Sequence, residues 1–94
     1  MVVTVLWDLD DDPDGNVQHI AEHGLTKEDV EDVLRNPKNW TGASSRTSGN
    51  PTVYGWTRSG LHIVVVFEHV DDDPLTVFPI TAYEVPPPKR RKKR

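Results

Sequence analysis

The apolar run "IVVVF", residues 63–67, is the feature that most limits how this 94-residue chain can fold. It is the longest apolar stretch, it is rich in valine, and it predicts a buried β-strand. It is far shorter than the roughly 20 apolar residues that span a bilayer. We therefore expect one small domain built around this strand, without membrane association.

The ends and the composition of the chain narrow the class of protein further. The apolar start "MVVTVLW" has no basic leader and stops at Asp8, so we expect no signal peptide and a cytoplasmic location. The chain has no cysteine, which excludes disulfides and thiolate chemistry. We expect no cofactor and no metal.

Several other segments have the composition of strands. They are residues 2–8, 51–57, 61–69 and 75–85, with a weaker, Ser- and Thr-rich candidate at 39–47. Turn residues separate the later strands at 48–50, 58–60 and 70–74. Short loops between successive strands predict antiparallel hairpins.

Two helices are expected between the first strand and the others. The first covers residues 16–22, with Asn16 as its N-cap and Val17, Ile20 and Ala21 on one face. The second begins after Thr26, which is a strong N-cap with Asp29 three residues later, as in a capping box. Its apolar face contains Val30, Val33 and Leu34, Leu25 precedes its cap as a hydrophobic staple, and Pro37 prevents its continuation.

The order β-α-α-β-β-β-β predicts an α+β fold. Two N-terminal helices would pack on one face of a mostly antiparallel four- to five-stranded sheet. If Ser59-Gly60 is a two-residue turn, Trp56 pairs with Ile63 and Tyr54 with Val65, and this apolar face meets the helices. The opposite face then shows Val53, Thr57, His62, Val64, Val66 and Glu68, and is where we expect a groove or a partner. A three- or five-residue turn would reverse the assignment.

The charge of the chain is divided between a body and a tail. Residues 1–88 contain five Lys and Arg and fifteen Asp and Glu, a net charge of −10, whereas "KRRKKR" at 89–94 carries +6. Three prolines precede this run and favour an extended spacer. We expect a domain at 1–85 and a Pro-rich, then basic tail at 86–94. The tail is either an arm for an acidic partner such as RNA, or a solvated end.

Several motifs occur together in an order that resembles a known family. They are "LWD", Asn16, "HIAEHGLTKEDVEDVLRNP", "SSRTSGNPTVYGWTRSGLHIVVVFE" and "PITAYEV". Their order and spacing over residues 6 to 85 resemble the BrnT-like toxin family, which is similar in architecture to RelE-type ribonucleases. The resemblance implies a metal-independent endoribonuclease that cleaves mRNA and is held inactive by a cognate antitoxin protein.

The resemblance can be followed residue by residue. His23-Gly24 and Arg46 match the family pattern, but Glu22 stands where a basic residue usually precedes the histidine. Leu61 and Tyr83 stand where the family carries arginines, and the basic tail replaces its last helix. These replacements favour a catalytically weak or degenerate member.

The resemblance and the residue chemistry together give a set of candidate site residues. Arg46, Tyr83 and His62 are the candidate catalytic residues, because RNA cleavage needs a proton acceptor, a proton donor and a cation. The candidate RNA-binding residues are Arg58, Lys89, Arg90, Arg91, Lys92, Lys93 and Arg94.

Two alternatives remain at this level. His19 and His23, four residues apart on a helix, have the spacing of a zinc-binding pair, although half-exposed helix-end histidines are the simpler interpretation. The second alternative concerns function: the chain would be a non-catalytic interaction module that binds a partner protein through its sheet face and basic tail.

Overall fold

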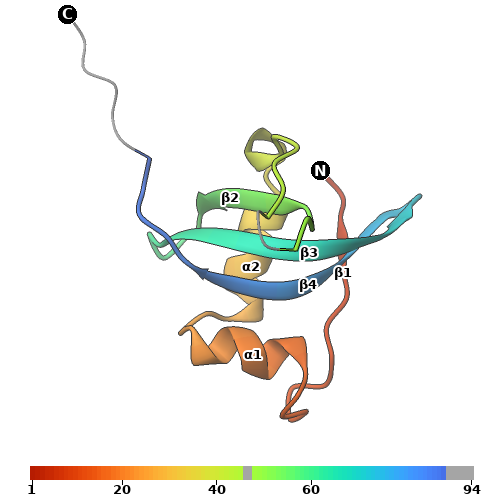
Figure 1. The fold of residues 1–94 in the computed structure, drawn as a ribbon, viewed down its shortest axis with the longest axis vertical. Helices are drawn as coiled ribbons and strands as arrows, with labels where there is room; N and C mark the ends of the chain where they lie inside the picture. Colours follow the sequence, from red (N-terminus) through yellow and green to blue (C-terminus); the bar gives the residue numbers. More distant parts are fainter. Residues whose placement is uncertain (46–47, 89–94) are drawn as a thin grey trace, which may run out of the picture.

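The two longest strands form the middle of the sheet. In the computed structural model, which describes residues 1–45 and 48–88, β3 (His62–Asp72) and β4 (Leu75–Glu84) pair as an antiparallel hairpin. The other edge of β3 pairs antiparallel with β2 (Thr52–Trp56), and β4 pairs parallel with the short β1 (Thr4–Val5). The result is a four-stranded mixed sheet of order β1-β4-β3-β2 (Figure 1). The predicted antiparallel hairpins are confirmed, and the parallel β1 makes the sheet mixed.

The two predicted helices are present and lie on one side of the sheet. They are α1 (Asn16–Glu22), which packs against β4, and α2 (Lys27–Leu34), which packs against β2 and β3 (Figure 1). Apolar residues of both helices and of the facing strands form one core: Ile20, Val30, Val33 and Leu34 with Val53, Ile63, Val65, Phe67 and Ala82. The α+β class is therefore confirmed.

The N-terminus of α2 has the predicted capping box. The Thr26 hydroxyl accepts a hydrogen bond from the Asp29 amide at 3.2 Å, and the Asp29 carboxylate accepts one from the Thr26 amide at 3.0 Å. Leu25 and Val30 are both buried, as the hydrophobic staple requires. An eight-residue helix is marginal alone, so these caps and the core together hold it.

Asn16 has a different role from the predicted N-cap. Gly15 is the N-cap of α1, and Asn16 is the first helical residue, only 4% exposed. Its side-chain oxygen accepts from the Asp8 amide at 2.9 Å, and its side-chain amide donates to the carbonyls of Leu6 and Pro79 at 3.1 and 3.0 Å. The side chain therefore ties the segment after β1 to β4, and every polar atom it buries is paired.

The strand predicted at 39–47 is wrong. A 3₁₀ turn, η1 (Pro37–Asn39), follows α2, and Ser44 makes only an isolated bridge with Pro51. Gly42 has a φ of +80°, a left-handed conformation that interrupts an extended chain. Trp40 instead packs on the core, where its ring lies 5.2 Å from that of Phe67. Arg46 and Thr47 lie outside the described residues.

The loop predicted at 70–74 is also shorter than expected. β3 runs to Asp72 and β4 starts at Leu75, so only Asp73 and a cis Pro74 separate the strands. Pairing continues to Asp72↔Leu75 because the end of this hairpin extends into solvent, where carboxylates keep their hydration.

The β2–β3 turn has three residues, and this reverses the predicted facing of β2. The Thr57 amide donates to the Leu61 carbonyl at 2.8 Å, and the Gly60 amide donates to the Thr57 carbonyl at 3.1 Å. Gly60, with a φ of +93°, completes the turn. Trp56 consequently pairs with His62 rather than with Ile63.

The reversed register changes what lies on each face of the sheet. Val53 and Gly55 of β2, and Thr57 just after it, are buried toward the helices, and Tyr54 and Trp56 are exposed on the opposite face. The assignment of β3 was right, because Ile63, Val65 and Phe67 belong to the helix-covered core. Gly55 is needed in this register, because a Cβ there would collide with the side-chain amide of Asn39. In the described part of the chain, neither helix is long and apolar enough to cross a membrane.

Val30→Asp is expected to destabilise the fold by about 2–5 kcal/mol, because it places an unpaired charge in a fully buried position of a small core. The measurement is the free energy of unfolding by chemical denaturation. Val70→Asp, at a half-exposed position of β3, is the matched control and should change stability little. Equal effects of the two substitutions would contradict the burial of this helix face.

Candidate functional site

The sheet face opposite the helices carries a cluster of exposed aromatic side chains, here called the open face. Tyr54, Trp56 and Tyr83 are 46%, 54% and 41% exposed. Val64 of β3 pairs with Tyr54 of β2 on one side and with Tyr83 of β4 on the other, and His62 pairs with Trp56. Side chains that are paired across strands share a face, so these residues form one surface.

A hollow lies on the open face between the two tyrosines. Its volume is about 300 Å³, and it is lined by Ser44, Ser45, Thr52, Tyr54, Val64, Val66 and Tyr83. Val64 and Val66 are almost fully buried. Thr52 is 4% exposed, and its hydroxyl is buried without a hydrogen-bond partner among the described residues. The hollow therefore combines apolar, aromatic and hydroxyl groups.

His62 is held in one orientation at the end of the open face. Its Nδ1 lies 3.2 Å from the Pro86 carbonyl oxygen, and its ring centroid lies 4.9 Å from that of Trp56. Because a carbonyl only accepts, this hydrogen bond requires the proton on Nδ1. In neutral His62, Nε2 is then the nitrogen that can accept a proton.

Tyr83 lies on the same face as His62. Tyr83 pairs with Val64, and the Val85 amide donates to the His62 carbonyl at 2.9 Å, so His62 and Tyr83 are diagonal neighbours on adjacent strands. Such neighbours have side chains about 7–8 Å apart. The Tyr83 ring is also 5.9 Å from that of His23, which contacts His19 at 5.5 Å. Two predicted catalytic residues are thus brought together.

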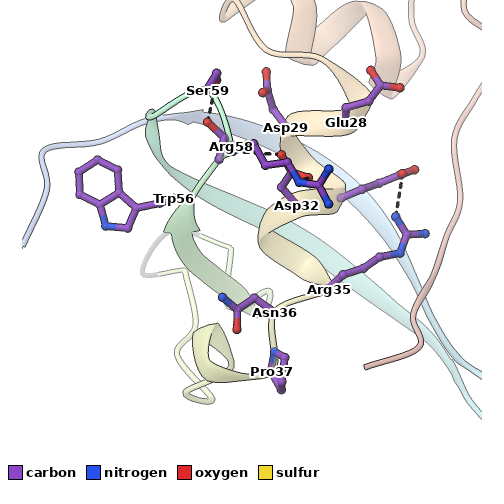
Figure 2. A pocket seen from close by; sticks show the side chains of 11 residues that line it. Glu28, Asp29, Asp32, Arg35, Asn36, Pro37, Trp56, Arg58 and Ser59 are labelled. Atoms are coloured by element: carbon purple, nitrogen blue, oxygen red, sulfur yellow. Dashed lines mark hydrogen bonds and ion pairs between the residues drawn. The ribbon is translucent and has the colours of Figure 1, made fainter.

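Among the described residues, no other predicted site residue joins His62 and Tyr83. Arg46 and Lys89–Arg94 lie outside the described residues. Arg58 lies beside α2, where its Nε is 3.4 Å from Asp32 Oδ1 and its amide donates to Asp32 Oδ2 at 3.2 Å. Figure 2 shows the Arg58 side chain directed toward α2, whereas Trp56 points away from it.

Arg58 and α2 border a second, larger depression. This groove of about 880 Å³ runs along α2 beside the β2–β3 turn, and its charged residues are Glu28, Asp29, Glu31, Asp32, Arg35 and Arg58 (Figure 2). Four carboxylates against two guanidinium groups give it a net negative charge, which repels RNA phosphates. The groove is therefore a poor place for a polyanion.

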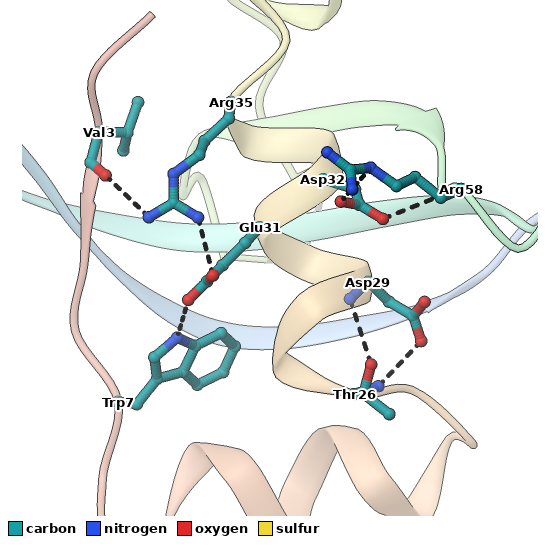
Figure 3. Close-up of polar contacts among 8 residues, drawn as sticks. All are labelled: Val3, Trp7, Thr26, Asp29, Glu31, Asp32, Arg35 and Arg58. Carbon is teal, nitrogen blue, oxygen red and sulfur yellow. Dashed lines mark hydrogen bonds and ion pairs between the residues drawn. The ribbon is translucent and has the colours of Figure 1, made fainter.

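Glu31, one of the carboxylates that line this groove, is hydrogen-bonded to two other side chains. Its carboxylate accepts from the Trp7 indole at 2.9 Å and from Arg35 at 2.7 Å, and Arg35 also donates to the Val3 carbonyl at 3.4 Å (Figure 3). Burial raises the pKa of Glu31, but the bonds from Trp7 and Arg35 outweigh it and hold the pKa below its ordinary 4.5. These contacts join the N-terminal segment to α2.

The described cations are mostly used in ion pairs. Lys27, Arg35 and Arg58 pair with Asp10, Glu31 and Asp32, and Lys38 is the fourth Lys or Arg in residues 1–45 and 48–88. None of the strand residues described on the open face is Lys or Arg. In the same part of the chain, no three His, Cys, Asp or Glu residues are grouped to hold a metal ion.

Sequence reasoning missed Thr52, Tyr54 and Trp56 as residues of the open face. It assigned a two-residue turn, which placed the two aromatic residues in the core. The turn sequence "RSG" does not distinguish the two registers, because a glycine with a positive φ suits the last position of a two-residue turn as well as that of a three-residue turn.

Glu31→Gln is expected to lower the free energy of unfolding by about 0.5–1 kcal/mol at pH 7, because the ion pair with Arg35 is lost. Since the folded pKa of Glu31 is depressed, the wild-type advantage is complete above pH 4.5 and is lost as the pH falls through the folded pKa. Denaturation of both proteins from pH 7 to 3 measures this. A difference that grows toward acid would contradict it.

Comparisons of the chain with family models, with curated proteins and with solved structures found no match. The geometry of the open face and the motifs of the chain are therefore the basis for the functional proposal.

Proposed function

We propose that the chain is a BrnT-like toxin-family protein of a toxin–antitoxin pair, that its open face engages RNA, and that its ribonuclease activity is weak or absent. The observation that carries the proposal is the placement of His62 and Tyr83 as diagonal neighbours on an exposed, aromatic sheet face. A RelE-like architecture also agrees with the two helices packed on the other face. The proposed partners are a cognate antitoxin protein and RNA.

His62 and Tyr83 have the chemistry that metal-independent RNA cleavage requires of a proton-transfer pair. The Nε2 of neutral His62 accepts the proton of the ribose 2′-hydroxyl, whose oxygen attacks the adjacent phosphorus. The Tyr83 hydroxyl donates a proton to the leaving 5′-oxygen, and a cyclic phosphate remains. The hydrogen bond from Nδ1 to Pro86 fixes the tautomer that leaves Nε2 free.

The charge of the site limits this chemistry. Negative charge builds up on the phosphorane, and cations near it usually supply a large part of the rate enhancement. The open face as described has none, because Leu61 and Tyr83 stand where the resemblance expects arginines. Arg46 and the tail are the cations left to supply this charge. Cleavage is therefore slow in this proposal.

Expression in a bacterial host without an antitoxin should be tolerated, because the open face has little charge with which to stabilise the phosphorane. At high protein concentration, any cleavage of single-stranded RNA should persist in a metal chelator and fall about 100-fold in His62→Ala and in Tyr83→Phe. His69→Ala, at the distant end of β3, is the control. Rapid growth arrest with mRNA cleavage would contradict weak catalysis, and failure to bind RNA would contradict the function.

A non-catalytic interaction module is the second candidate. The observation in its favour is that three exposed aromatic side chains share a face with no described Lys or Arg, as in many protein-binding surfaces. In this case the open face binds a partner protein, and the tail contacts acidic groups of that partner. A protein partner that is displaced by Trp56→Ala, from a chain that does not bind RNA, would favour it.

The basic tail should supply most of the electrostatic attraction to RNA, because residues 1–88 carry a net charge of −10. Changing Lys89–Arg94 to glutamine should weaken binding of single-stranded RNA at low salt. The logarithm of the affinity should fall with the logarithm of salt with a slope of up to about 4 for the full chain, and close to zero for the variant. Equal affinities would show that the tail is a solvated end.

A further inference from the structure

We propose that the hollow between Tyr54 and Tyr83 binds one nucleobase of a single-stranded RNA. This inference rests on the proposed function and adds to it a base-recognition site beside His62 and Tyr83. The hollow takes the base. Tyr83 stands at the edge of the hollow, and His62 lies beside it.

The aromatic residues are the first argument. Tyr54 and Tyr83 flank Val64 on neighbouring strands, so their rings stand on either side of the same apolar floor. Both side chains are more than 40% exposed, and the His23 ring lies 5.9 Å from that of Tyr83. Aromatic side chains on a sheet are the usual stacking platform for unpaired bases, because every base has a π-face.

The unpaired hydroxyl of Thr52 is the second and independent argument. Thr52 lines the hollow, and its buried Oγ1 lacks a hydrogen-bond partner among the described residues. Buried hydroxyl groups nearly always have a partner, and a polar group of a ligand in the hollow would supply one for Thr52. A threonine hydroxyl both donates and accepts, and the edge of a base offers donors and acceptors at the rim of a flat apolar ring.

The size of the hollow sets the class of ligand. About 300 Å³ is at the lower end of small-molecule pockets, and it suits one base rather than a peptide segment or a folded domain. The remaining wall is formed by Ser44 and Ser45, which are polar and small. A planar ring with polar edges matches this lining better than an aliphatic side chain does.

The position of the chain end favours a polyanion as the molecule that carries the base. Val85 and Pro86 are hydrogen-bonded to His62 at the edge of the open face. Six cations follow Pro88 in the sequence, and they lie outside the described residues. Cations attract the phosphates on either side of a bound base, whereas the acidic groove along α2 repels them.

The experiment separates base recognition from attraction to phosphates. The full chain is titrated with a short single-stranded RNA and with the same RNA lacking its bases, and the affinities are measured by fluorescence anisotropy. The tail meets the same number of phosphates in both RNAs, so their affinity ratio reports the bases alone. We expect the RNA with bases to bind about tenfold more tightly.

Two variants then locate the site. Tyr54→Ala should bring the ratio close to one, and Thr52→Val, which keeps the side-chain shape, should reduce it about threefold. Val70→Ala, on the far end of β3, is the matched control for an exposed side chain and should leave the ratio unchanged. Unfolding curves of all variants exclude loss of the fold as the cause.

Each outcome decides between the proposals. Equal binding of the two RNAs by the unaltered chain would overturn the base pocket and leave RNA binding intact, whereas no binding of either RNA would overturn the proposed function as well. If neither variant lowers the affinity ratio, the bases bind at another place on the chain. If the variants no longer bind a protein partner but keep the affinity ratio, the open face is a protein-binding surface. This outcome would also overturn the base pocket.

Discussion

The turn Arg58-Ser59-Gly60 is the constraint on which the two faces of the sheet depend. Its third residue has a positive φ, which allows the Thr57 amide to reach the Leu61 carbonyl and fixes Trp56 opposite His62. A shift of one residue would bury Tyr54 and Trp56 and expose Val53 and Gly55. The hydrophobic core and the candidate site are therefore two consequences of one backbone geometry.

Long-range polar contacts hold the remaining segments on this sheet. Asn16 joins the residues after β1 to Pro79 of β4, and Glu31 joins Trp7 to Arg35 at the end of α2. Both use groups that would be costly to bury unpaired, so they favour one arrangement of the N-terminal segment over others. They also hold Arg35 in an ion pair with Glu31, whereas the ion pair of Arg58 with Asp32 lies at an exposed position.

This distribution of charge shapes the functional proposal. Arg35 and Arg58 pair with Glu31 and Asp32 of α2, and none of the described strand residues of the open face is Lys or Arg. A site of this kind is better equipped to bind an unpaired base and to move a proton than to stabilise a phosphorane. The proposed function, weak catalysis with RNA recognition, agrees with both properties.

Elements whose signals are local could be predicted from the amino-acid sequence. The capping box of Thr26 and Asp29, the apolar face of α2, and the strands around "IVVVF" depend on neighbouring residues, and all were predictable. The facing of Tyr54 and Trp56, the buried role of Asn16, and the absence of a strand at 39–45 follow from the folded arrangement. The facing of Tyr54 and Trp56 depends on which register the adjacent turn adopts. The other two depend on partners distant in the chain: a carbonyl of β4 for Asn16, and a core position beside Phe67 for Trp40. The hollow beside Thr52 became visible only when residues from the 44–45 segment and from three strands were placed together.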